Sequence, residues 1–119
     1  CGSETGFSVT PYGDWHYKEL EVFVDKLGLT PLEAITCGTK NASQAMRRDD
    51  LGVIAEGNIA DLIVISEDPS KDVTRLGNKD LIEKVFLNGK EVDLTPAPKR
   101  INDPSGWRIS SYSNKILEK

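Results

Sequence analysis

Apolar side chains recur at helical spacing in the first third of the chain. Between Asp14 and Gly28 the apolar positions are three or four residues apart, which places them on one face of a helix: Leu20, Phe23, Val24 and Leu27. Asp14 is a suitable residue to cap the start of this helix, and Gly28 stands where a left-handed residue commonly ends one. The pattern therefore predicts an amphipathic helix over residues 14–28.

Two shorter helices are predicted next. Thr30 precedes Pro31, whose fixed φ suits a first helical position, and Glu33 completes a capping box with Thr30. This arrangement predicts a helix from Pro31 to about residue 37. The stretch KNASQAMRR, residues 40–48, predicts another helix, which places three apolar residues on one side: Ala42, Ala45 and Met46.

Beyond residue 50 the pattern becomes that of strands. Residues 62–65 form a short apolar run rich in β-branched side chains, and residues 82–87 form a second run of strand length. Asn88 and Gly89 follow directly, and this pair strongly indicates a tight hairpin with a return strand through Val92. With helices first and short antiparallel strands after them, the isolated chain is predicted to be an α+β domain.

Composition limits the partners that are expected. The chain has 119 residues, enough for one domain at most, and with 38% hydrophobic and 29% charged residues it has little material for a self-sufficient core. That composition indicates a missing partner surface. A net charge of −4 argues against nucleic acid as a partner, because a phosphate-backbone binder needs a basic patch. No apolar run reaches the length of a membrane helix, so a membrane is not an expected partner either.

Cysteine usage bears on location. Cys1 and Cys37 do not make the disulfide framework of a small secreted domain, which fits a reducing compartment and a cytoplasmic location. An alternative is open, because mature bacterial lipoproteins begin with a lipid-modified Cys that is often followed by Gly or Ser. If Cys1 is such a terminus, the protein is lipid-anchored or periplasmic.

Taken alone, the candidate catalytic groups are few. His16 is the one histidine of the sequence and lies four residues before Leu20, beside the apolar stripe, which favours a surface or packing role. A zinc site needs at least three protein ligands drawn mainly from His and Cys, so this chain is not expected to bind a metal by itself. The acidic pair Glu67 and Asp68 is interpreted as part of a solvated turn, and Asp61 as a structural residue.

Four segments, taken in chain order, resemble the C-terminal portion of an amidohydrolase-superfamily enzyme, nearest the branch of imidazolonepropionases and Xaa-Pro dipeptidase-like hydrolases. The segments are GSETG, GLTPLEAITCGTKNASQAM, DDLGVIAEGNIADLIVISEDPSKDVTRL and IEKVFLNGKEV. The resemblance covers residues 2–93 and is most specific over residues 51–65. Six residues there match the family pattern in register: Gly52, Ile54, Gly57, Ala60, Asp61 and Leu62.

The resemblance implies a division of the chain. Residues 1–50 would be the end of the last strand of a (β/α)8 barrel, its loop and the C-terminal helices of the barrel. Residues 51–94 would supply C-terminal strands of a β-sandwich domain, and residues 95–119 would form a linker and a tail outside the resemblance.

The resemblance also implies an activity. In this superfamily a divalent metal, here expected to be zinc, activates a water that attacks a carbonyl carbon, so the expected reaction is cleavage of a C–N bond in a small peptide-like or cyclic amide. Glu4 stands where the family has its last metal-binding Asp and is the candidate metal ligand and catalytic residue. Its extra methylene leaves that role in question. Tyr12 stands where a His-Gly pair is common and is the candidate substrate-binding residue.

Two functions therefore stay open. The first is a part of a metal-dependent amidohydrolase whose remaining metal ligands lie on sequence absent from this chain. The second is a truncated, non-catalytic fragment that acts as an interaction or oligomerisation module. An isolated end of a barrel leaves helix faces and strand edges uncovered, so the expected partner is the missing N-terminal part of the enzyme or another copy of the chain.

Overall fold

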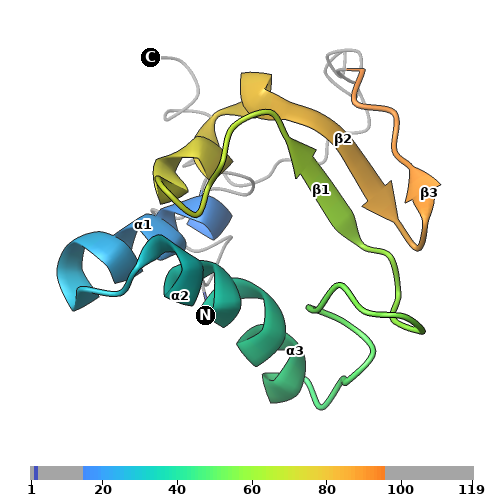
Figure 1. The fold of residues 1–119 in the computed structure, drawn as a ribbon, viewed down its shortest axis with the longest axis horizontal. Coiled ribbons are helices and arrows are strands. Elements are labelled where there is room, and N and C mark those ends of the chain that lie inside the picture. Colours follow the sequence, from blue (N-terminus) through green and yellow to red (C-terminus); the bar gives the residue numbers. More distant parts are fainter. Residues whose placement is uncertain (1, 3–14, 96–119) are drawn as a thin grey trace, which may run out of the picture.

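The computed structural model describes Gly2 and residues 15–95, and in that part the helices precede a small sheet (Figure 1). The helical elements are α1 (Trp15–Leu27), α2 (Pro31–Thr36), the π-helix η1 (Cys37–Asn41) and α3 (Ala42–Ala45). They are followed by β1 (Leu62–Ile65), the 3-10 helices η2 (Val73–Gly77) and η3 (Lys79–Leu81), β2 (Ile82–Leu87) and β3 (Lys90–Glu91). The predicted α+β order is confirmed. None of the helices in the described residues is long and apolar enough to cross a membrane.

The ends of the first two helices agree with the predicted capping residues. α1 ends at Leu27, and Gly28 follows it with a left-handed φ of 73°. The Thr30 side chain accepts a hydrogen bond from the Glu33 N–H at 3.3 Å, and Glu33 Oε2 accepts one from the Thr30 N–H at 2.8 Å. The capping box at the start of α2 is therefore confirmed, whereas Asp14 lies outside the described residues.

The two short helices predicted separately form one continuous helical run. Cys37 and Ala42 have right-handed helical φ angles of −62° and −63°, so η1 joins α2 to α3 without a break. The predicted break between residues 37 and 40 is wrong, and the helical run passes close to α1 at its glycine. A Cβ at Gly38 would lie 3.0 Å from Leu20 Cδ2, so the absent side chain lets the helix approach α1 closely.

The three strands form one antiparallel sheet in the order β1-β2-β3. Asn88 and Gly89 form the turn between β2 and β3 with φ angles of 51° and 75°, as a type I′ turn requires. The predicted hairpin is confirmed, and the Val92 N–H extends it by donating to the Val85 carbonyl at 2.8 Å. Between β1 and β2 the register pairs Leu62 with Phe86, Ile63 with Val85 and Val64 with Lys84, and then shifts before Ile65.

Few side chains of the described residues are buried. Within that part, the buried hydrophobic residues are Ala34, at 0% exposure, and Val73, at 3%. Ser43 is also buried, and its hydroxyl donates to the carbonyl of Arg48. Six large apolar side chains expose 60% or more of their surface: Leu27, Leu32, Met46, Ile54, Ile63 and Leu87. The core of the described part is therefore incomplete.

One close contact holds the helices against the segment between β1 and β2. A Cβ at Gly77 of η2 would lie 2.5 Å from Cε2 of Tyr17, so the ring of Tyr17 on α1 rests directly on the glycine backbone. Val73 of the same 3-10 helix is one of the buried residues. This contact holds α1 against η2, and a hollow lies further along, between the helices and β1.

Candidate functional site

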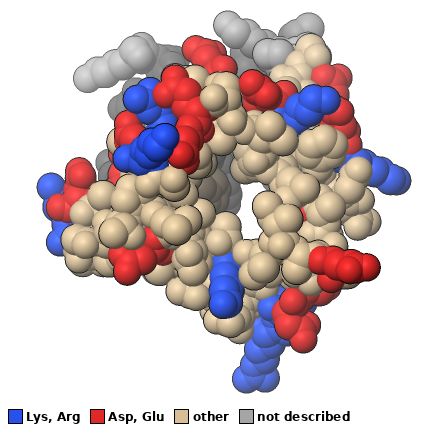
Figure 2. Space-filling view, viewed as in Figure 1, with Lys and Arg blue, Asp and Glu red and all other residues tan. Residues whose placement is uncertain are grey.

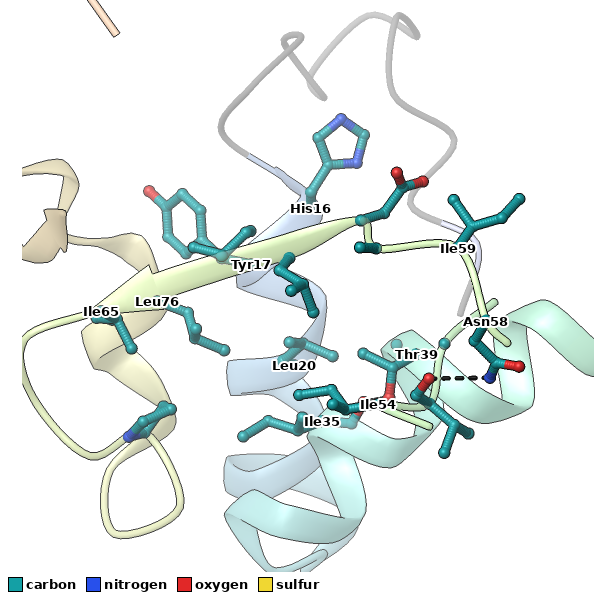
Figure 3. A pocket seen from close by; sticks show the side chains of 18 of the residues that line it. His16, Tyr17, Leu20, Ile35, Thr39, Ile54, Asn58, Ile59, Ile65 and Leu76 are labelled. Atoms are coloured by element: carbon teal, nitrogen blue, oxygen red, sulfur yellow. Dashed lines mark hydrogen bonds between the residues drawn. The ribbon is translucent and has the colours of Figure 1, made fainter. Parts of the chain in front are cut away.

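An apolar hollow of about 780 Å³ lies between the helices and β1. Figure 2 shows it as an opening near the centre of the molecule, and most of the charged atoms in that view lie on the outer surface instead. Leu20 of α1 and Ile35 of α2 line the helical side, and Ile65 of β1 lies on the strand side (Figure 3). Ile63 of β1 also lines the hollow. The loop over residues 52–61 forms a third side.

Backbone contacts hold this loop in place. Gly52 has a φ of 74°, and a Cβ at that position would lie 2.6 Å from the carbonyl oxygen of Thr39 on η1. The Asn58 side-chain amide donates to the Val53 carbonyl at 3.0 Å (Figure 3). The glycine therefore permits close contact with the helix, and the asparagine closes the loop on itself.

Asp61 links the loop to the β-hairpin. Its Oδ1 accepts a hydrogen bond from the Asn88 N–H at 2.7 Å, and the Gly89 N–H donates to the Ala60 carbonyl at 2.9 Å. The carboxylate thus binds a backbone amide of the hairpin turn, which supports the structural interpretation made from the sequence. Gly52, Asn58 and Asp61, all within residues 51–65, shape the backbone of the hollow.

His16 lies at the rim of the hollow. It is on the first turn of α1 and is exposed, and it lines the hollow together with its neighbour Tyr17 (Figure 3). The surface position predicted from its spacing to Leu20 is confirmed.

The predicted site residues Glu4 and Tyr12 lie outside the described residues, so their roles stay predictions. The residues that flank their segment are described. The Gly2 N–H, two residues before Glu4, donates to Glu19 Oε1 on α1 at 2.8 Å. The helix itself begins at Trp15, three residues after Tyr12. Both ends of the segment that carries the two candidates are therefore attached to the N-terminal half of α1.

The described residues do not form a metal centre by themselves. Among Gly2 and residues 15–95, no group of three or more His, Cys, Asp or Glu side chains is placed to hold a metal ion. A zinc site needs at least three protein ligands, so the donor set of this part does not fit one.

The acidic residues between β1 and η2 are engaged in turns and ion pairs. Glu67 Oε2 lies 2.7 Å from the Arg75 guanidinium, and Asp68 Oδ1 accepts hydrogen bonds from the hydroxyl and N–H of Ser70. The Ser70 donors hold the pKa of Asp68 below its ordinary value. Since both carboxylates are exposed and belong to local contacts, their interpretation as a solvated turn is confirmed.

The hollow itself was not predicted from the sequence. Ile54 and Ile59 line it from a loop, where no helical or strand periodicity marks an apolar residue as inward-facing. Ile54 is 88% exposed, which is unusual for a large apolar side chain in a well-packed domain. The sequence signal that could have pointed to the hollow is the apolar content of residues 51–60, a stretch that also holds two turn-forming glycines.

Comparison with known proteins identifies relatives of this chain. Residues 15–92 match the sequence profile of the amidohydrolase family. An imidazolonepropionase of Pyrobaculum arsenaticum is 49% identical over 45 residues, which is 38% of this chain and 11% of that protein. An ochratoxinase of Aspergillus niger is 35% identical over 74 residues, covering 60% of this chain and 15% of that protein.

A solved structure supports the likeness in three dimensions. The crystal structure of A. niger ochratoxinase superposes with a TM-score of 0.62 at 32% sequence identity and covers 66% of this chain and 18% of that one. The chain thus spans less than one fifth of the relatives that it matches. The predicted resemblance is confirmed at the level of the superfamily. The dipeptidase-like branch, the barrel and the β-sandwich stay predictions.

Proposed function

The chain belongs to the amidohydrolase family, and we propose that it is the C-terminal part of a metal-dependent hydrolase that cleaves a C–N bond of a small peptide-like or cyclic amide. The observation that carries this proposal is the family match over residues 15–92. The likeness to A. niger ochratoxinase supports it, because sequence identity and backbone geometry agree over the same part of the chain.

Glu4 is the residue of this chain that we assign to the metal site. A carboxylate is a suitable ligand for zinc and for other divalent metals. Since the described residues hold no metal centre of their own, the remaining ligands would come from other parts of the enzyme. Tyr12 would contact the substrate through its ring or hydroxyl.

The described residues would then act as a scaffold. Gly2 is tied to Glu19 of α1, and α1 is tied to η2 through Tyr17, so the segment with Glu4 and Tyr12 starts and ends on a supported helix. The exposed side chains Leu27 and Leu32, near the end of α1 and the start of α2, offer apolar surface to the rest of the enzyme. The proposed partner is therefore the N-terminal part of the same hydrolase.

The experiment uses the chain within a polypeptide that carries the rest of the metal site, assayed on dipeptides, N-acyl amino acids and cyclic amides. Glu4→Gln should lower kcat by about 10²–10⁴-fold, the range for loss of a catalytic proton acceptor, whereas Glu4→Asp should retain activity because it keeps the carboxylate. A chelator should abolish the activity and zinc should restore it. Glu83→Gln, an exposed residue of β2, is the matched control and should leave kcat unchanged. Full activity of Glu4→Gln would refute the assignment.

The alternative is a non-catalytic interaction or oligomerisation module. The incomplete core favours it, because the described residues include no large side chain that is fully buried. If this alternative holds, the 119-residue chain should form a defined oligomer in sedimentation equilibrium. A double variant with Leu27→Ser and Leu32→Ser should dissociate it. Metal-dependent amide hydrolysis by any polypeptide that contains the chain would exclude the alternative.

A further inference from the structure

The turn between β2 and β3 consists of Asn88 and Gly89, a pair with a chemistry of its own. Asparagine is a thermolabile residue, because the backbone nitrogen of the next residue can attack the carbon of its side-chain amide. A glycine in the second place leaves that approach open, since it has no Cβ. Both residues are exposed, and a Cβ at Gly89 would meet only Ala60, at 4.0 Å. The turn therefore holds the groups that a self-modification needs.

The reaction consumes only water. The Gly89 nitrogen forms a bond to Cγ of Asn88 and loses its proton, and the side-chain nitrogen leaves as ammonia with that proton. The product is a five-membered succinimide ring. Water then breaks one of the two C–N bonds of the ring, which leaves either aspartate or isoaspartate, whose backbone runs through the former side-chain carbon.

Two hydrogen bonds hold the reacting backbone in the closed turn. The Gly89 N–H donates to the Ala60 carbonyl at 2.9 Å, and the Asn88 N–H donates to Asp61 Oδ1 at 2.7 Å. In Figure 1 the turn lies at the end of the sheet where the chain enters β1, beside the residues that accept these bonds. The attacking nitrogen is thus bound through the proton that it must lose, and the turn has to open before it reacts.

We propose that Asn88 is a site of spontaneous covalent modification, at which the chain forms a succinimide and then isoaspartate, and that the contacts of Ala60 and Asp61 with the turn restrain this reaction. The Asp61 contact is the stronger restraint, because a hydrogen bond to a charged group contributes more than a neutral one. The proposal uses neither the metal nor Glu4, so it stands independently of the hydrolase activity.

Modification of Asn88 releases the hairpin. Isoaspartate adds a carbon to the backbone, so the φ angles that define the type I′ turn are lost. Both products also bring a second carboxylate into the turn that binds Asp61, and like charges at this distance repel. The strand beyond the turn, β3, has only the two residues Lys90–Glu91 to retain it on β2.

Mass spectrometry of the peptide that carries Asn88 tests the proposal on the full 119-residue chain. The chain is incubated at neutral pH with and without guanidinium chloride, and chromatography separates the aspartate and isoaspartate forms. Ammonia loss should be slower by about tenfold or more in the folded chain, because only molecules with an open turn react. Asn78 is exposed and followed by Lys79, whose side chain hinders the attack, so it should react more slowly than Asn88 in the denatured chain.

Variants of Asp61 separate the restraint by the turn contacts from the reactivity of the pair. Asp61→Ala should speed ammonia loss about tenfold in the folded chain, because a hydrogen bond to a charged group is removed, and should change nothing in guanidinium chloride. Asp61→Asn keeps an oxygen acceptor without the charge and should fall in between. Asp93→Ala is the matched control. Asp93 Oδ1 accepts a hydrogen bond from the Thr95 N–H at 2.9 Å, so this variant removes the same kind of contact outside the turn.

The rates at Asn88 decide the proposal. It is overturned if Asn88 stays intact in guanidinium chloride, or if the unsubstituted chain reacts equally fast with and without the denaturant. It is also overturned if Asp61→Ala is folded by circular dichroism and reacts no faster than Asp93→Ala. If Asp61→Ala is unfolded, Asp61→Asn takes its place in this comparison.

Discussion

At Gly52, the loop after α3 meets the surface of η1. The residue combines a left-handed φ of 74° with a backbone position that leaves no room for a side chain, since a Cβ would lie 2.6 Å from the Thr39 carbonyl oxygen. Two residues further on, Ile54 lines the hollow. This single glycine therefore determines how closely the loop, and with it one side of the hollow, approaches the helix.

Replacing Gly52 by alanine should be costly. Gly52→Ala combines an unfavourable left-handed φ with a steric clash against backbone atoms, and we expect it to lower the free energy of unfolding by roughly 1–3 kcal/mol. Gly57→Ala is the matched control, because Gly57 has a φ of 87° but nothing within 4 Å of its Cβ position. It bears the left-handed φ penalty alone, about 1–2 kcal/mol, and should therefore cost less than Gly52→Ala. Urea denaturation followed by circular dichroism measures both, and equal losses would show that the contact with Thr39 does not matter.

At the level of elements, the capping box ties the stability of α2 to pH. Glu33 accepts hydrogen bonds from the N–H and the hydroxyl of Thr30, and these donors hold the pKa of Glu33 below its ordinary value. A lowered folded-state pKa means that the stabilisation is present above the unfolded value of about 4.3 and is lost as the pH falls through the folded value.

Glu33→Gln should therefore change the pH dependence more than the fold. Glutamine can still accept the hydrogen bond from the Thr30 N–H, but it does not titrate. We expect the unsubstituted chain to lose its stability advantage over Glu33→Gln as the pH is lowered from about 5 to 2, measured by urea midpoints at each pH. When both proteins also carry Thr30→Ala, the pH-dependent difference in stability between them should shrink, because Glu33 has lost the hydrogen bond from the Thr30 hydroxyl. A difference that stays constant across this range would contradict the linkage.

The elements show which structure a sequence pattern can predict. The capping box and the Asn88-Gly89 turn depend on residues within three or four positions of each other, and both were predicted. The continuous run from α2 to α3 was not predicted: Gly38 is helical and lies close to Leu20, eighteen residues earlier, a contact that the local pattern does not show. The candidate site shows the same difference. Glu4 and Tyr12 were predicted from a family pattern, whereas the hollow was not predicted because it is formed by loop residues that distant contacts bring together.

At the scale of the whole molecule, apolar surface remains uncovered. Leu32 on α2 is 61% exposed and Leu27 at the end of α1 is 64% exposed, although both belong to well-formed helices. A neighbouring surface would gain about 25 cal/mol for each Å² of apolar area that it covers. The relatives that match this chain are several times longer, which provides the length for such a surface.

Leu32→Ser should distinguish the isolated chain from the completed enzyme. In the 119-residue chain the side chain is largely in water, so the substitution should change the free energy of unfolding by less than about 0.5 kcal/mol. In a polypeptide that includes the rest of the hydrolase, Leu32 should be buried, and the same substitution should cost about 1.5–3 kcal/mol. Lys26→Ser, an exposed polar site on α1, should be neutral in both. Urea denaturation of the three proteins in each context gives the comparison, and a neutral Leu32→Ser in the longer polypeptide would mean that the partner surface lies elsewhere.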